Sequence, residues 1–362
     1  MINLDDVNVY KKLDQGEAAE SIRLLSDQIE QTWVDSKSII VPPGFKKDIN
    51  KVVVNGMGGS NLGFRIIRSV FKDVMKVPLI VEPGYDVPGF VDKNTLYIIS
   101  SYSGNTEEPL STYEKAKKKR ARIMAITSKS MDNKLMDLIE KKKIPSFVFD
   151  PENNPSGQPR LGIGYSVFGA IRLLEKAGVL KVSSETAREV VAGIKGRDPF
   201  WNVNVKLRRN FAKRLAQELL GKIVVIVGSE FLEGNIHALR NQLSENGKSF
   251  SSYLISPDLN HFALEGLDHP SFIKDKFRFL FFNSDLYNEK TQKRNILIRQ
   301  ILEKKSIPYS EVNLKSRIKL AQSFEVLQFG SWLSFYMAIL NGVDPSPIPW
   351  VDWFKDRLSR ID

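Results

Sequence analysis

Short apolar strands alternate with helical stretches along this chain, and the alternation occurs twice, which restricts the possible fold more than any other feature. In the strands of the first half, apolar residues do not alternate regularly with polar ones. Strands of that kind are typical of a parallel sheet that helices cover on both faces. The expected strands of the first half are Lys51–Val54, Val77–Val81, Thr95–Ser100, Arg122–Ile126 and Ser146–Phe149.

The second half begins the pattern again with a strand similar in type to the first one. A helical stripe follows it, formed by Leu232, Ile236, Leu239 and Leu243. The expected strands here are Lys222–Val227, Phe250–Ile255, Phe277–Phe282 and Tyr309–Val312. We therefore predict an α/β protein formed by internal duplication, with two doubly wound parallel-sheet domains. Residues 1–182 form the first domain with a leading helical segment, and residues 183–362 form the second with terminal helices.

The composition excludes several classes of protein. The chain has 53 Lys and Arg residues against 42 Asp and Glu residues, a net charge of +11, and it contains no cysteine. The lack of cysteine excludes disulfides and thiolate catalysis. No apolar run approaches the ~20 residues needed to span a bilayer, and no basic segment precedes an apolar core at the N-terminus. We expect a cytoplasmic protein with no membrane partner.

The densest basic run is Lys115–Arg122, at the end of a predicted helix. Lysines in the last turn of a helix complement its dipole, so the run is interpreted as a solvated helix end. A nucleic-acid-binding stripe is the alternative, but no helix-turn-helix, zinc or RNP pattern accompanies it. We expect no nucleic-acid partner, although a basic surface favours small anions such as sugar phosphates.

Ser101–Thr106, with the sequence Ser-Tyr-Ser-Gly-Asn-Thr, lies between an apolar strand and a helix that begins at Glu107. A helix N-terminus has unpaired N–H groups and partial positive charge, so it can bind an anion. An ordinary helix cap is the alternative, but a cap needs only one of these polar residues. The whole set, with Gly104 for the turn, favours a phosphate monoester as ligand.

Two segments resemble the SIS (sugar isomerase) domain, whose members bind sugar phosphates. Ser101–Thr106 is similar to the Ser-x-Ser-Gly-x-Thr signature of that domain, and Val54–Ser60 is similar to the glycine loop after its first strand. The resemblance implies a phosphate site formed by Gly58, Gly59, Ser60, Ser101, Ser103 and Thr106.

A dinucleotide-binding loop is the competing interpretation of the same glycines. Gly56-x-Gly58 follows a strand, and Glu82 closes the next strand, where a ribose-binding acid would lie. However, Asn61 occupies the position of the third glycine of G-x-G-x-x-G. The serine loop would also have no role, so we favour the sugar-phosphate interpretation.

Segments of the second half resemble the bifunctional phosphoglucose/phosphomannose isomerases, a family with two SIS domains. They are Arg240–Lys248 with its Glu-Asn pair, the pair Asn260-His261, and Asn341–Pro347 followed by Lys355. The resemblance extends from about Val52 to Lys355, nearly the whole chain. It implies aldose–ketose isomerisation of glucose 6-phosphate and fructose 6-phosphate through ring opening and an enediolate. Mannose 6-phosphate is a further candidate substrate, and no cofactor or metal is implied.

The resemblance also implies roles for four residues. Glu245 is the base that moves a proton between C1 and C2, a task that suits a carboxylate. Arg160, in a Pro-Arg segment, stabilises the enediolate oxyanion. His261 and Lys355 assist ring opening. Each of these four residues could instead be structural, as a surface charge or a packed histidine. His237 matches no family position, and we expect it to be structural.

The chain departs from the family pattern after His261, where Phe262-Ala263 replaces Asn-Glu, and in the first loop, where Asn61-Leu62 replaces small residues. These departures concern substrate range and rate rather than fold.

The resemblance implies a homodimer in which the His261 segment reaches the neighbouring active site. Two alternatives remain, a non-catalytic sugar-phosphate sensor built on the same fold and an amino-sugar phosphate isomerase.

Overall fold

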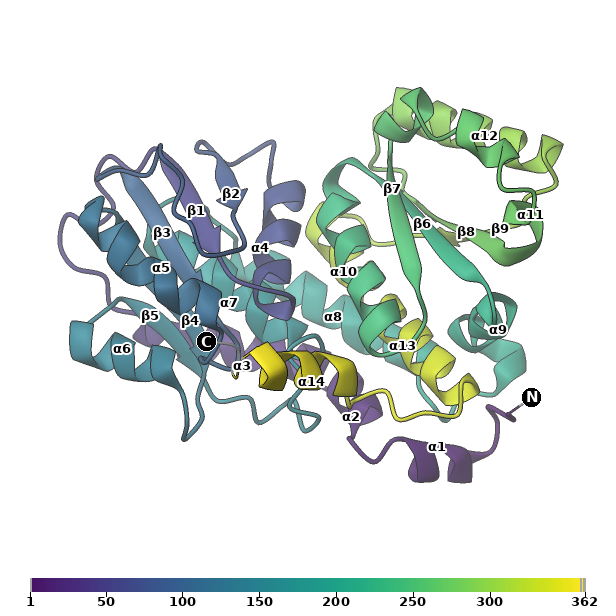
Figure 1. Ribbon diagram of the computed structural model, residues 1–362, viewed down its shortest axis with the longest axis horizontal. Helices are drawn as coiled ribbons and strands as arrows, with labels where there is room; N and C mark the ends of the chain where they lie inside the picture. The colour runs from purple at the N-terminus through teal and green to yellow at the C-terminus, as the bar shows by residue number, and fades with distance from the viewer. Residues whose placement is uncertain (1, 359, 361–362) are drawn as a thin grey trace.

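The structure, a computed structural model, describes residues 2–358 and 360. Within those residues the first half forms a parallel sheet of order β2-β1-β3-β4-β5 (Figure 1). Its middle strands are buried on both faces, as the apolar runs predict. The strands are β1 (Lys51–Asn55), β2 (Leu79–Val81), β3 (Thr95–Ser100), β4 (Arg122–Ser128) and β5 (Ser146–Phe149).

The second half forms another parallel sheet, of order β7-β6-β8-β9. In each sheet the first strand along the chain pairs with both the second and the third, so the two halves share one winding. This arrangement confirms the predicted α/β fold with two doubly wound parallel sheets. The strands are β6 (Ile223–Ser229), β7 (Ser251–Ser256), β8 (Phe277–Asn283) and β9 (Tyr309–Asn313).

Helices surround both sheets (Figure 1). The predicted stripe of four leucine and isoleucine side chains lies at the start of and along α10, where all four are buried. The helices are α1 (Val7–Leu13), α2 (Ala18–Arg23), α3 (Leu25–Asp35), α4 (Gly59–Val70), α5 (Glu107–Lys118), α6 (Lys134–Lys142), α7 (Ile163–Lys176), α8 (Ser184–Trp201), α9 (Phe211–Leu219), α10 (Glu233–Glu245), α11 (Ile273–Lys276), α12 (Glu289–Lys304), α13 (Lys319–Leu340) and α14 (Pro349–Leu358).

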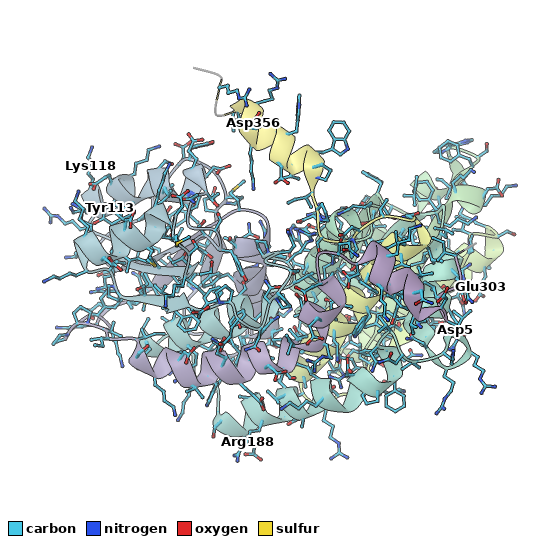
Figure 2. The ribbon with its side chains drawn as sticks, turned by 90° about the horizontal axis from the view of Figure 1, so that it is seen from below. Asp5, Tyr113, Lys118, Arg188, Glu303 and Asp356 are labelled. Carbon is cyan, nitrogen blue, oxygen red and sulfur yellow. The ribbon has the colours of Figure 1, made fainter. Side chains whose placement is uncertain are left out.

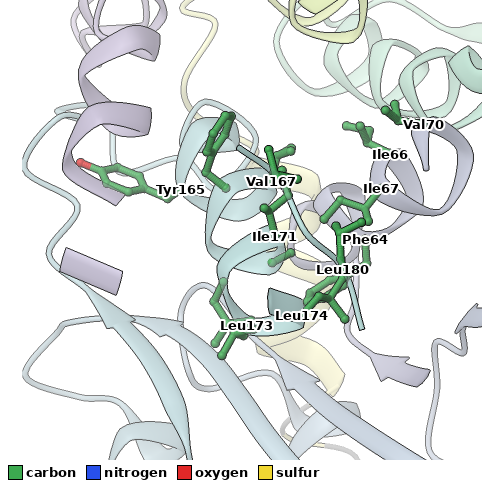
Figure 3. Close-up of a cluster of buried hydrophobic side chains, with 14 of the residues drawn as sticks. Phe64, Ile66, Ile67, Val70, Tyr165, Val167, Ile171, Leu173, Leu174 and Leu180 are labelled. Carbon is green, nitrogen blue, oxygen red and sulfur yellow. The ribbon is translucent and has the colours of Figure 1, made fainter. Parts of the chain in front are cut away.

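The largest apolar cluster fills the space between the first sheet and the helices α4 and α7. Phe64 and Ile67 of α4 lie beside Ile171 and Leu174 of α7 in this cluster (Figure 3). All four side chains are fully buried. Burying an aliphatic or aromatic side chain of this size contributes roughly 1.5–3 kcal/mol, so this layer fixes the position of the loop that precedes α4.

Helix α13 joins the two halves. Every residue after its first is buried, including the polar Gln322, Glu325 and Gln328, so the helix has no solvent-facing side. Phe324 belongs to the cluster of the first half, whereas Trp332 belongs to that of the second. Helices α4 and α10 also meet across the halves, because Gly234 leaves no side chain between them, and a Cβ there would lie 2.4 Å from the Arg65 carbonyl oxygen.

The first residues of the chain contact the second half. Leu4, Tyr10 and Ile22 belong to the apolar cluster of that half, and the buried Lys213 ammonium donates to the Leu4 carbonyl oxygen at 2.7 Å. The division at residue 182 stays a prediction. Leu25 and Ile29 belong to the cluster of the first half, so the leading segment is shared between the two cores.

Helix α14 carries no buried residue among those described. Figure 2 shows it standing away from the rest of the molecule. Its Trp350, Trp353 and Phe354 side chains are all more than half exposed. Across residues 2–358 and 360, no helix is both long and apolar enough to cross a membrane.

Candidate active site

The glycine loop after β1, together with the first turn of α4, brings Gly58, Gly59 and Ser60 to the carboxyl end of the first sheet. Gly58 has a φ of 49°, a conformation that side chains disfavour. A Cβ on Gly59 would lie 3.0 Å from Cβ of Pro159. Glycine at this position therefore lets the loop approach the segment that carries Arg160.

The serine loop between β3 and α5 is folded around the Ser101 hydroxyl. Ser101 is buried, and its Oγ lies 2.8 Å from Thr106 Oγ1 and accepts from the Gly104 amide at 3.1 Å. Gly104 is required, because its φ is 74° and a Cβ would overlap the Asn133 side chain. Among residues 2–358 and 360, the side chain of Thr106, the N-cap residue of α5, makes no capping hydrogen bond. Ser103 is the exposed hydroxyl of the loop.

Ser60 connects the two loops. Its Oγ accepts from the Tyr102 amide at 2.8 Å, and its carbonyl oxygen accepts from Ser100 Oγ at 2.6 Å. The cavity beneath, lined in part by Gly59, measures about 10 Å³, which holds at most one water molecule. A sugar phosphate would therefore bind on the exposed side of the loops.

Arg160 is the most enclosed charged group at the site, with 1% of its side chain exposed. Its Nε donates to Asn246 Oδ1, Nη1 donates to Gln158 Oε1 at 2.8 Å, and Nη2 donates to the carbonyl oxygens of Pro345 and Ser346 at 2.9 and 2.7 Å. These bonds satisfy a buried cation that would otherwise be costly. They fix the plane of the guanidinium.

Glu245, the last residue of α10, faces this guanidinium. The Arg160 Nη1 atom lies 3.5 Å from Glu245 Oε2, and 28% of the glutamate side chain is exposed. Burial raises the pKa of Glu245, although the charges of Arg160, Lys248 and Lys355 oppose the rise. A carboxyl group with a raised pKa that is still reachable from solvent suits a general base.

Two lysines extend the positive charge around Glu245. Lys248 donates to the carbonyl oxygens of Glu245, Pro345 and Pro347, and its pKa is lowered to about 8 by burial and by the nearby Arg160 charge. Lys355, on the exposed helix α14, contributes through its charge, which lowers the pKa of Glu245. The terminal helix therefore lies within electrostatic range of the proposed base.

His261 lies apart from this group. It ends the short 3₁₀ segment Asp258–His261 after β7 and is exposed. Among residues 2–358 and 360, no hydrogen bond or ion pair joins it to Glu245 or Arg160. Phe262, beside it, is 60% exposed.

Sequence reasoning missed the groups that hold the arginine. Asn246 and Lys248 were inside a segment that resembles the family, but no role was derived for either. The carbonyl oxygens of Pro345 and Ser346 come from a part of the chain 185 and 186 residues away from Arg160. Backbone acceptors carry no residue signature, so only the two Pro residues and the Gly of Asn341–Pro347 could have indicated them.

His237, on α10, faces Tyr253 of β7 and lies within range of the α4 arginines Arg65 and Arg68. Its Nδ1 is 3.3 Å from Tyr253 OH and its Nε2 is 3.2 Å from Arg240 Nη2. Burial and the charges of Arg65, Arg240 and Arg68 lower its pKa to about 4. The imidazole is therefore neutral at neutral pH, and the structural role of His237 stays a prediction.

Acidification should destabilise the fold through His237. Because the pKa is about 4 in the folded state and about 6.5 when unfolded, the unfolded chain binds the proton more readily between these values. The free energy of unfolding should fall as the pH drops through this window. Urea unfolding at several pH values should show a smaller fall for His237→Gln. The exposed His269→Gln is the control, and equal pH dependence of all three proteins would contradict the assignment.

Comparison with known proteins identifies the family of this chain. A family model of the bacterial phospho-glucose isomerase C-terminal SIS domain matches residues 208–358. The bifunctional phosphoglucose/phosphomannose isomerase of Caldicellulosiruptor bescii is 32% identical over 344 residues, which cover 94% of this chain and 99% of that protein. The chain belongs to the bifunctional phosphoglucose/phosphomannose isomerase family. A second family member, from Thermoplasma volcanium, is 30% identical over 86% of this chain and 92% of its own length.

A solved structure supports the fold of this family member. A hypothetical protein from Thermus thermophilus matches with a TM-score of 0.74 at 14% identity, covering 98% of this chain and 92% of that one. In this chain, the matched residues 208–358 contain Glu245, His261 and Lys355. Arg160 comes from the first half, so the candidate site combines residues of both halves.

Proposed function

We propose that this protein interconverts glucose 6-phosphate and fructose 6-phosphate, with mannose 6-phosphate as a second aldose substrate. The observation that carries the proposal is the Arg160–Glu245 pair, a buried guanidinium 3.5 Å from a carboxylate that solvent can reach. The glycine loop touches the segment of this arginine. This close approach supports a phosphate anchor and an acid–base group on neighbouring segments.

In this proposal Glu245 removes a proton from C2 of the open aldose and returns it to C1 of the enediolate, while a hydroxyl proton moves from O2 to O1. A raised carboxyl pKa favours this exchange, because the base must both take and release the proton near neutral pH. Arg160 faces the developing oxyanion with N–H groups that are already oriented, so its stabilisation needs little rearrangement. His261 and Lys355 open and close the sugar ring.

The phosphate group is assigned to Gly58, Gly59, Ser60, Ser101, Ser103 and Thr106. Support comes from the N-terminus of α5, where the Thr106 side chain makes no capping hydrogen bond among the described residues, since a helix N-terminus favours an anion. Ser103 presents its exposed hydroxyl directly. Ser101 acts mainly by holding Thr106 in place at 2.8 Å.

Replacing both hydroxyls of this pair, in the double variant Ser101→Ala with Thr106→Ala, should raise KM for the sugar phosphate by more than tenfold. The variant loses interactions that are each worth about 0.5–1.5 kcal/mol, or more towards a charged phosphate. Steady-state kinetics would measure the effect, with Ser111→Ala on the exposed side of α5 as control. Unphosphorylated glucose should be a negligible substrate, and an unchanged KM would remove the phosphate site from this loop.

A homodimer belongs to the same proposal. The exposed Trp350, Trp353 and Phe354 of α14 form an apolar surface that water disfavours, and such surfaces mark protein interfaces. Exposed Phe262 beside His261 supports a second contact of this kind. We infer that the His261 segment of one subunit enters the active site of its neighbour, and that two-fold symmetry repeats the contact.

A coupled assay with glucose 6-phosphate, mannose 6-phosphate, fructose 6-phosphate and glucosamine 6-phosphate tests the function. Turnover of the first three, and none of glucosamine 6-phosphate, is expected. Turnover of glucosamine 6-phosphate alone would indicate an amino-sugar isomerase, and binding of sugar phosphates without turnover would indicate a sensor. The proposal includes a cytoplasmic location, because phosphorylated sugars are charged and cross bilayers poorly.

A further inference from the structure

The turn before α14 holds one end of the Arg160 guanidinium. Arg160 Nη2 donates to the Pro345 carbonyl oxygen at 2.9 Å and to the Ser346 carbonyl oxygen at 2.7 Å. Both of these residues are buried. A backbone carbonyl points where the conformation of its own turn directs it. The shape of residues 344–346 therefore determines where the Nη2 end of the guanidinium lies.

The Asp344 carboxylate closes this turn from both sides. Its Oδ1 accepts from the Ser346 amide at 2.8 Å, the bond that defines an Asx turn. Its Oδ2 accepts from the Gly16 amide at 3.2 Å, which lies 328 residues earlier in the chain. Within the described part of the chain, no hydrogen bond or ion pair joins Asp344 to Arg160 directly. Asp344 therefore acts on the arginine only through the turn.

The leading segment of the chain meets this turn at Gly16. The Ser346 hydroxyl donates to the Gly16 carbonyl oxygen at 3.0 Å. Figure 1 shows the connection from α13 to α14 passing close to α1 and α2, the helices that flank Gly16. Gly16 has no left-handed φ, but a Cβ there would lie 2.3 Å from Ser346 Cβ. Glycine is therefore required here by the close approach of the turn.

Gly16 is itself held in place by the helix that follows it. The Asp14 carboxylate accepts from the Ala18 amide at 2.7 Å and from the Ala19 amide at 3.0 Å. Ala18 and Ile22 of α2 belong to the apolar cluster of the second half. The leading segment thus gives the turn a support that is anchored in the core.

We propose that Asp344 is a positioning residue for Arg160, and that Gly16 forms the other side of the same brace. The inference rests on the role of Arg160 in the proposed isomerase reaction. The brace keeps the guanidinium 3.5 Å from the Glu245 carboxylate. A donor that is oriented before the reaction stabilises an oxyanion without rearrangement, and a misplacement of about 1 Å can cost about 10²-fold in rate.

Asp344→Ala should lower kcat for glucose 6-phosphate by about 10- to 100-fold. KM should change little, because Arg160 acts on the enediolate rather than on the phosphate. Asp344→Asn keeps an oxygen for one of the two amides, so its kcat should fall only about threefold to tenfold. Asp6→Ala is the matched control, since Asp6 Oδ1 accepts from the Asn8 amide at 2.9 Å in the same leading segment. Its kcat should equal that of the parent protein.

A double variant shows whether the effect passes through the arginine. In an Arg160→Lys background, Asp344→Ala should lower kcat by less than about threefold, because the guanidinium that the brace holds is no longer present. A general loss of structure would lower kcat by the same factor in both backgrounds, and that result would overturn the proposal. Circular dichroism would show whether Asp344→Ala folds, and Asp344→Asn replaces it in this comparison if it does not.

The other side of the brace is tested by steric overlap. Gly16→Ala should lower kcat by about tenfold or more, because the new methyl group overlaps the Ser346 side chain. In a Ser346→Gly background the overlapping atoms are gone, so Gly16→Ala should have no further effect. Gly196→Ala, at a glycine of α8 with open space around it, is the control. An equal effect of Gly16→Ala in both backgrounds would contradict the contact.

NMR spectra of the arginine side chains separate this inference from the proposed function. The Nε–H signal of Arg160, which donates to Asn246, is identified by its loss in Arg160→Lys. Its exchange with water should be about tenfold or more faster in Asp344→Ala than in Asp6→Ala or the parent protein. A parent protein without isomerase activity would overturn the proposed function, and this exchange rate would still decide the brace. Equal exchange in Asp344→Ala and the parent protein would overturn the inference.

Discussion

Glu245→Gln is expected to lower kcat by about 10²–10⁴-fold, the usual contribution of a general base. The amide keeps the shape of the side chain and can still accept from Arg160, but it cannot hold the transferred proton. KM for the sugar phosphate should change little, because the serine loop is untouched. Steady-state kinetics with glucose 6-phosphate would measure both constants.

The matched control is Glu233→Gln, at the other end of α10. Glu233 pairs with Arg68 at 2.8 Å on a partly exposed surface, and such pairs contribute about 0–1 kcal/mol. Its loss should leave kcat unchanged.

In the parent enzyme, kcat/KM should also decline as the pH falls through the raised pKa of Glu245, because the protonated carboxyl group can no longer act as the base. Near-normal kcat in Glu245→Gln would assign the base elsewhere.

Mixing two inactive proteins, Glu245→Gln and His261→Ala, is expected to restore activity once their subunits exchange. If each site takes its glutamate from one chain and its histidine from the other, a mixed dimer has one site with both lesions and one with neither. About half the parent activity per mixed dimer is then the ceiling. The expectation follows from the position of His261, which is exposed and bonded to neither Glu245 nor Arg160 among the described residues.

The reciprocal mixture is the control. A Glu245→Gln, His261→Ala double variant mixed with the parent protein should give mixed dimers with no intact site, because each site carries one lesion. If each site takes both residues from one chain, both results are reversed. The mixture of the two single variants then shows no recovery, and the mixed dimers of the double variant with the parent protein keep half the activity. Native mass spectrometry would establish that exchange has occurred. A monomer at assay concentration would end the composite-site hypothesis.

Much of the fold was predictable because its signals are local. The strand Thr95–Ser100 was predicted with its observed bounds, since a short apolar run between turn residues has few other interpretations. Strand β2 was predicted two residues too long, because Pro78 lies in the apolar run and has no N–H for the ladder. The contact of Leu4 and Tyr10 with the second half was not predicted, because nothing local specifies which core a short amphipathic helix covers.

The site was predictable only in part for the same reason. Residue type and order suggested Glu245 and Arg160, and the structure brings them within 3.5 Å. The inward turn of Ser101 towards Thr106 depends on a left-handed Gly104 packed against Asn133, which sequence alone does not give.

The bonds of Arg160 also bear on the order of synthesis. Chains emerge from the ribosome N-terminus first, and their domains tend to fold as they emerge. The first sheet is complete at Phe149, yet Arg160 needs Asn246, 86 residues later, and the carbonyl oxygens of Pro345 and Ser346. A nascent chain could thus form its first sheet while this arginine still faces water. Isomerase activity should arise only after residue 346 has left the exit tunnel.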